Sequence, residues 1–218
     1  MDTVTIRNQI QCARQHETFT HELASLLQGR LKRLHSAICV KSAQPHLLLL
    51  SFVTTFVDRT PDLLDTIQEV TRHTSQEELS DRICNICLGF FTAPPPLLKG
   101  HNGMNGVMAK AYLCRRTIEE INDCYRVYCH QPLLPVDFTG SNLIIHQLIG
   151  EPLSNLLDNL VHIATSQLYE THNFRDVARL GSAETDTLLA ACQRRDLLGD
   201  NLCQSVMISN FFPGCTIH

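Results

Sequence analysis

The sequence predicts an all-α fold, a compact bundle of roughly seven to nine helices of which several are long and amphipathic. Leucine occurs 31 times and tryptophan is absent. Apolar residues recur three or four positions apart, and glycine and proline gather in a few places instead of recurring every ~8–12 residues as in a β-sandwich. At 44% hydrophobic and 18% charged residues, the chain can bury a sizeable core. We therefore expect one helical domain over residues 1–218, with the Pro/Gly-rich loop 93–106 as the point of any subdivision.

Three start signals support individual helices. Thr60 precedes Pro61, which suits the first position of a helix. Ser75 and Glu78 are spaced as a capping box, and Ser141 supplies another capping hydroxyl. The apolar pattern over residues 4–40 fits one long helix, with a break near 15–18 or at Gly29. The next helix, over residues 45–59, lacks a polar face and should lie at the centre of the bundle. The expected helices cover about residues 4–40, 45–59, 60–73, 75–91, 107–130, 141–149, 152–180 and 183–198.

The net charge and the cysteine content limit the classes of protein to which the chain can belong. The formal net charge of −4 argues against dedicated nucleic-acid binding, which needs a strongly positive face. No basic segment followed by an apolar one opens the sequence, so we expect an intracellular protein, cytoplasmic or nuclear, whose ten cysteines are reduced thiols. The longest apolar run, 47–57, falls well short of the roughly 20 residues that cross a bilayer. Cys215 begins a prenylation-like tetrapeptide, but its terminal histidine and the missing polybasic run disfavour lipidation.

Cys84 and Cys87 are the candidate metal ligands, because two thiolates three positions apart can hold one tetrahedral zinc. Against this, the same spacing on a helix places both thiols on one buried face, and cysteine is among the most buried residue types. No second close pair follows, so we favour a core role and keep a zinc-stabilised module as the alternative. The further thiols and imidazole that zinc would need are Cys114, Cys124, Cys129 and His130.

The eleven histidines raise a second metal alternative, a His/Glu metal-dependent helical enzyme. Glu17 and His21 share one helix face, as do Glu69 and His73, but the Glu-x-x-His spacing of diiron bundles does not occur. A Glu–His pair four apart more often stabilises an exposed helix. We therefore expect no resident cofactor, with zinc as the open alternative. A metal-dependent enzyme would need several of these histidines to converge with carboxylates: His16, His21, His35, His73, His146, His162 and His172.

The segment 99–106 contains three glycines and precedes an expected helix, so its backbone amides could bind an anion. There is no Gly-Lys-Ser/Thr motif and no acidic residue for magnesium. We expect a flexible loop between helices.

No motif joins a nucleophile, a base and oxyanion donors, so we predict a non-enzymatic protein-protein interaction module, such as an adaptor, a regulatory or a viral accessory protein. Long amphipathic helices can bind a partner protein, or a second copy of the chain, through apolar faces. The tail residues Phe211, Phe212 and Ile217 are the predicted partner-binding residues, together with Phe90 and Phe91 beside the proline run.

Overall fold

The computed structural model of the chain describes residues 3–130, 132–171, 182–195 and 206–208. These residues confirm the all-α bundle. Two three-residue 3₁₀ turns, Leu31–Arg33 and Pro96–Leu98, lie between helices. The described elements are α1 (Val4–Thr20), α2 (Glu22–Arg30), β1 (Ile38–Val40), α3 (Pro45–Thr71), α4 (Glu77–Thr92), α5 (Gly103–Cys129), α6 (Thr139–Ile149), α7 (Leu153–Thr171), α8 (Ser182–Arg194) and β2 (Val206–Ile208).

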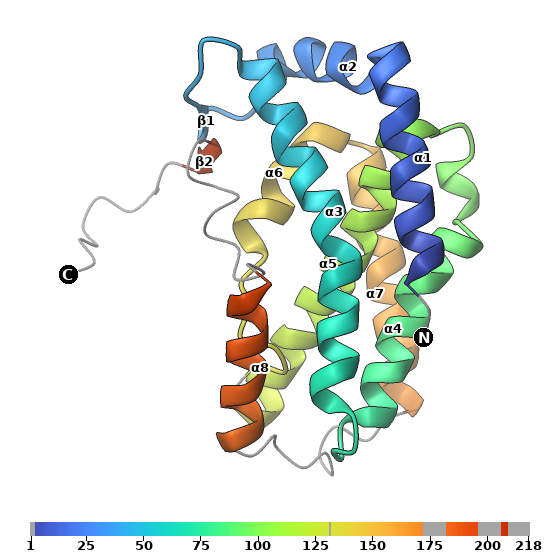
Figure 1. Ribbon diagram of the computed structural model, residues 1–218, viewed down its shortest axis with the longest axis vertical. Coiled ribbons are helices and arrows are strands. Elements are labelled where there is room, and N and C mark those ends of the chain that lie inside the picture. The colour runs from blue at the N-terminus through green and yellow to red at the C-terminus, as the bar shows by residue number, and fades with distance from the viewer. Residues whose placement is uncertain (1–2, 131, 172–181, 196–205, 209–218) are drawn as a thin grey trace, which may run out of the picture.

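Helix α5 is the central element of the bundle (Figure 1). It packs against α1, α3, α4, α6 and α7, while α8 packs on α3 and α2 runs across one end of the bundle (Figure 1). Side chains from before and after the 93–102 connection share one core cluster. Its fully buried members include Ile6, Phe56, Val57, Leu113, Ile121, Ile145 and Leu157. Among the described residues, no helix combines the length and apolarity needed to cross a bilayer.

The first predicted helix is broken at His21, which adopts a left-handed conformation with φ of 52°. The break lies after the predicted 15–18 site and well before Gly29. The buried Glu17 carboxylate holds the corner, because its two oxygens accept hydrogen bonds from the backbone amides of Leu23 and Ala24, each at 2.9 Å. A side chain of α1 therefore satisfies the free amides at the start of α2.

The two helices predicted over 45–59 and 60–73 are one helix, α3, and the start signal at Thr60 is wrong. Pro61 lies inside α3, where it has no amide hydrogen to donate to the preceding turn. Two side chains donate to the carbonyl of Phe56 next to this interruption: Thr60 Oγ1 at 3.1 Å and Arg115 Nη2 at 3.0 Å. Packing on α5 thus supports a continuous helix that the local pattern divides.

The other two predicted caps are also displaced. Glu77, not Glu78, reaches back before α4, where its Oε2 accepts a hydrogen bond from the His73 amide at 2.9 Å. Ser141 lies inside α6 and donates to the Phe138 carbonyl at 3.0 Å.

Strands β1 and β2 pair antiparallel, with Cys39 opposite Met207. The helix predicted to continue to residue 40 is wrong beyond Arg30, where α2 ends and β1 follows. Neither strand was predicted, because each is only three residues long and its partner is distant along the chain. The predicted ends of the last two helices lie partly outside the described residues, at 172–181 and 196–198.

Candidate functional site

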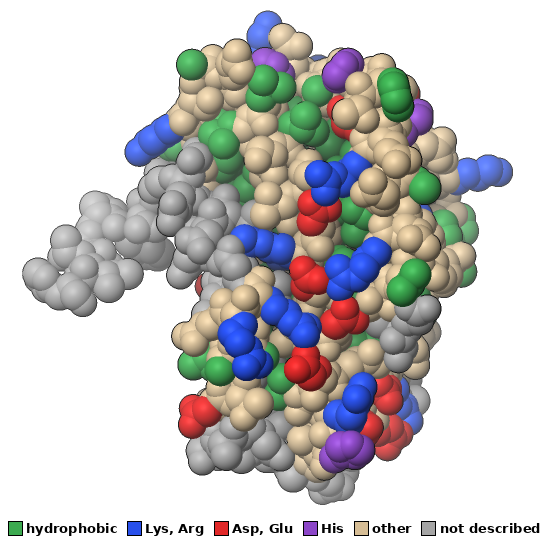
Figure 2. Space-filling view, in the orientation of Figure 1, with side chains coloured by type: hydrophobic (Ala, Val, Ile, Leu, Met, Phe, Trp, Pro, Cys, Tyr) green, Lys and Arg blue, Asp and Glu red, His purple; other side chains and the backbone are tan. Residues whose placement is uncertain are grey.

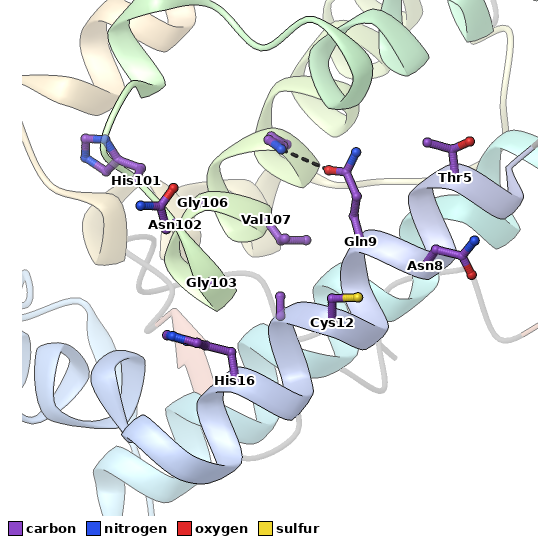
Figure 3. Close-up of a pocket in the computed structure, with 12 residues that line it drawn as sticks. Thr5, Asn8, Gln9, Cys12, His16, His101, Asn102, Gly103, Gly106 and Val107 are labelled. Atoms are coloured by element: carbon purple, nitrogen blue, oxygen red, sulfur yellow. Dashed lines mark hydrogen bonds between the residues drawn. The ribbon is translucent and has the colours of Figure 1, made fainter.

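A cavity of about 580 Å³ lies between α1 and the start of α5 (Figure 3). One wall consists of the residues that follow each other along one face of α1, namely Thr5, Asn8, Gln9, Cys12, Ala13 and His16. The other wall consists of the loop before α5 and its first two turns, namely His101, Asn102, Gly103, Gly106, Val107 and Lys110. These twelve lining residues include one lysine and two histidines but no aspartate or glutamate. We call this cavity the α1–α5 pocket.

Two glycines shape the wall that α5 contributes, and residues 103–106 form the first helical turn instead of the predicted flexible loop. A Cβ at Gly106 would collide with the carbonyl oxygen of His101, so only glycine lets the preceding loop lie this close. Gly103 has a φ of 57°, and a Cβ there would lie 3.1 Å from Nδ1 of His16. The missing side chain at Gly103 lets the His16 ring of α1 lie against the start of α5 (Figure 3).

The amides at this helix end have no side-chain cap. Asn102 is the N-cap residue, and its side chain makes no capping hydrogen bond. The first intrahelical bond runs from the Gly106 amide to the Asn102 carbonyl at 3.1 Å. The amides of 103–105 precede it and have no acceptor within the helix, which makes this end electropositive.

Lys110 supplies the positive side chain of the α1–α5 pocket. Its Nζ donates to Oε1 of Gln9 at 2.9 Å, the dashed line in Figure 3, and lies 5.7 Å from the ring centre of Phe91. Burial lowers the pKa of Lys110 because it removes water from the ammonium group. Within the described part of the chain, no aspartate or glutamate forms an ion pair with this lysine.

Cys12 and His16 are four apart on α1, but the geometry does not make them a nucleophile and base. Figure 3 shows the thiol and the imidazole pointing in different directions along the helix. The His16 Nδ1 lies 3.4 Å from Oγ1 of Thr20 instead. Cys12 and His16 therefore do not form a paired catalytic thiol and base.

A second polar cavity, of about 360 Å³, lies beside an ion-pair network that joins α5, α6 and α7. The Arg116 guanidinium pairs with Glu119, and its Nε lies 3.4 Å from Oδ1 of Asp158. The Tyr112 hydroxyl donates to the same Asp158 oxygen at 2.7 Å, and burial together with this bond raises the pKa of Tyr112. Burial opposes the charge of Arg116, but its hydrogen bond to Glu119 and the nearby charges of Glu119 and Asp158 together raise the pKa of Arg116. The Asn142 side-chain amide of α6 donates to Oε2 of Glu119 at 2.7 Å, so the network connects α5, α6 and α7.

An apolar groove of about 310 Å³ lies where α1, α2 and α3 meet. Figure 2 shows apolar side chains gathered over this end of the molecule. Leu47 in the groove is 44% exposed. The apolar lining is Ala24, Leu47, Leu50 and Met104, and the polar residues around it are Arg14, Glu17, Thr18, His21 and Thr54.

The candidate zinc ligands Cys84 and Cys87 are both fully buried on α4. Cys84 Sγ lies 3.8 Å from the Leu64 carbonyl oxygen, and Cys114 Sγ lies 3.5 Å from the Cys87 carbonyl oxygen. Burial raises the pKa of the Cys84 thiol, which disfavours the thiolate that zinc binds. In the part of the chain that the structure describes, no three His, Cys, Asp or Glu side chains come together as a metal site. The arrangement favours the core role, and the zinc alternative stays a prediction.

The other predicted site residues lie apart from these pockets. Phe211, Phe212, Ile217 and Cys215 lie outside the described residues, as does His172. Phe90 and Phe91 are buried against the core, so the prediction that they are free for a partner is wrong. Lys110 and Gln9 were missed, because they are 101 positions apart and neither forms a local motif. The one usable signal was the glycine segment before α5.

Comparison of the chain with family models, with curated proteins and with solved structures finds no match.

Proposed function

We propose that the chain is a non-enzymatic protein-interaction module of the cell interior, cytoplasmic or nuclear, which binds a helical segment of a partner in the α1–α2–α3 groove. The observation that carries the proposal is the exposed side chain of Leu47 in this groove. Exposed apolar groups in a concave apolar surface with a polar border are typical of binding sites.

The groove suits a helix because its lining is apolar and polar side chains border it. Leu47 and Leu50 are three apart on α3, and Arg14 and Thr18 are four apart on α1. An amphipathic helix presents apolar residues at the same spacing and polar residues beside them. A second copy of the chain is the other partner that the test below distinguishes.

The test compares two double variants. Leu47→Ser with Leu50→Ser removes two apolar side chains that line the groove, and Leu156→Ser with Ile163→Ser removes two on α7 that are 50% and 54% exposed. Proteins recovered with each variant from the native cell are quantified by mass spectrometry, and self-association is measured by light scattering. We expect the groove variant to reduce recovery of its partner about tenfold or more, because such anchors dominate binding energy. Equal recovery with both variants, at unchanged melting temperatures, would contradict the proposal.

A further inference from the structure

We propose that two copies of the chain associate through the outer face of α7, with the two α7 helices antiparallel about a two-fold axis. This surface is separate from the α1–α2–α3 groove of the proposed function. Helix α7 packs on α5 and lies on the far side of the bundle from α3 (Figure 1). Helix α6 packs on one side of it, and α4 lies on the other.

Apolar side chains are exposed on the outer face of α7. Leu156 is 50% exposed and Ile163 is 54% exposed. The two are seven positions apart, almost two helical turns, so they lie on one line along the helix. Leu143 on α6 is 51% exposed and lines the same cavity as Asp158 of α7, so α6 extends this apolar face. Exposed apolar groups gathered on neighbouring helices are typical of a contact surface.

A groove of about 360 Å³ between α4 and α7 borders this face. Its apolar lining is Ile86 of α4 and Ala164 and Leu168 of α7. Ala164 directly follows Ile163, so the groove runs beside the exposed apolar line. An apolar side chain of a second copy can therefore be buried next to α7.

The charge of the face favours a second copy as its occupant. The exposed residues of α7 between positions 155 and 167 include no lysine, arginine, aspartate or glutamate: Asn155, Leu156, Asn159, His162, Ile163 and Gln167. Other helices of this protein expose charges, such as Arg7 and Arg14 on α1 and Glu78 and Asp81 on α4. In a two-fold contact each residue near the axis meets its own copy, so a charge there would repel itself. An uncharged face has no such repulsion.

The exposed residues of α7 are also arranged symmetrically along the helix. Asn159 lies three positions after Leu156 and four before Ile163, so all three share one face. When two α7 helices cross antiparallel beside Asn159, Leu156 of each copy faces Ile163 of the other. The Asn159 amide both donates and accepts hydrogen bonds, so it can pair with its own copy. One polar residue at such a position fixes the register of two helices.

The size of the face sets the expected affinity. Helix α7 has 19 residues, which corresponds to a length of about 28 Å and, at a width of about 10 Å, to roughly 300 Å². A standard stable interface buries about 800 Å² per partner, so residues of α4 and α6 contribute the rest. We therefore expect a dissociation constant of the dimer on the order of micromolar.

The first experiment measures the mass of the full chain by light scattering between about 1 and 100 μM, the range that brackets a micromolar dissociation constant. The expected result is a monomer at the lowest concentration that becomes a dimer as the concentration rises. A monomer throughout would overturn the inference. This measurement on the wild type stands even if a charged variant fails to fold.

Charged variants locate the contact. Leu156→Glu or Ile163→Lys should each raise the dissociation constant of the dimer about tenfold or more, because each buries an unpaired charge against an apolar side chain. Val127→Lys is the matched control at a 69% exposed position of α5 and should change it less than about twofold. Circular dichroism checks that the melting temperatures agree. Equal effects at positions 127 and 163 would contradict the inference.

An equimolar mixture of Leu156→Glu and Ile163→Lys tests the antiparallel register. In the mixed dimer the two new charges face each other at one contact, and the other contact keeps the wild-type pair of Leu156 and Ile163. The mixture should therefore associate more tightly than either variant alone. A mixture that associates no better than the separate variants would overturn the antiparallel pairing.

The groove variant separates this inference from the proposed function. Leu47→Ser with Leu50→Ser should lose the partner and keep the dimer, whereas Leu156→Glu should lose the dimer and keep the partner. If the groove variant dissociates the dimer and the α7 variants do not, self-association belongs to the groove and the inference is wrong.

Discussion

Arg115 is a fully buried cation in the core of the bundle, and no described carboxylate pairs with it. Its guanidinium carbon lies 4.2 Å from the ring centre of Phe56 and 5.2 Å from that of Phe138. Burial, followed by the nearby charge of Arg59, lowers the pKa of Arg115 to about 9. Aromatic faces and the Phe56 carbonyl therefore stabilise a charge that the core would otherwise exclude.

We predict that Arg115→Met lowers the free energy of unfolding by less than about 1 kcal/mol, because methionine keeps much of the volume and removes the desolvation cost. Arg115→Ala should cost about 3 kcal/mol, since it leaves a cavity. Urea denaturation monitored by circular dichroism measures both. A methionine variant as unstable as the alanine variant would show that the charge itself stabilises the core.

Arg115 also makes the stability of the fold depend on pH. The pKa of Arg115 is lower in the folded state than in the unfolded chain, so above about pH 9 the unfolded chain binds more protons and folding gains stability as pH rises. Below that pH both states hold the proton and this contribution is constant. Between about pH 8 and pH 10, the free energy of unfolding of the wild type should therefore rise relative to that of Arg115→Met.

At the scale of the element, the corner between α1 and α2 depends on Glu17. Its side chain is 8% exposed and accepts the Leu23 and Ala24 amides. Glu17→Ala removes both hydrogen bonds from the start of α2 and should lower the free energy of unfolding by about 1–2 kcal/mol. Gln15→Ala, at an exposed position of the same helix, should change it by less than about 0.5 kcal/mol. Thermal melting measures both, and equal effects would show that the hydrogen bonds of Glu17 do not stabilise the corner.

At the scale of the whole molecule, burial divides the cysteines into two reactivity classes. Cys12 is exposed, whereas Cys84, Cys87 and Cys114 lie in the core, and all four are free thiols. In native protein, brief treatment with iodoacetamide should modify Cys12 and leave the three core thiols intact until the protein unfolds, because burial limits access and raises the pKa of Cys84. Peptide mass spectrometry reads out each site.

Two results would contradict this assignment. Rapid modification of Cys84 or Cys87 in the native protein would place them outside the core. One zinc bound per chain and released by Cys84→Ala would assign the pair to a metal site instead.

Several elements could be predicted from the residues alone, because helical periodicity is a local property of the chain. The helix that contains Cys84 and Cys87 was expected over 75–91 and spans Glu77–Thr92. Local patterns failed where a neighbouring element changes the balance. Pro61 indicates a helix start in the sequence, but α5 and its Arg115 help hold α3 continuous through it.

The candidate sites, like the helices, could be predicted from the sequence only in part. The glycines at the start of α5 signal a close approach of the chain, since a Cβ at Gly106 would collide with the His101 carbonyl oxygen. Only the tertiary structure shows that Gln9 faces Lys110 and that Ile38–Val40 pairs with Val206–Ile208. Those contacts join surfaces that packing brings together from distant parts of the chain, and no spacing within either segment specifies its partner.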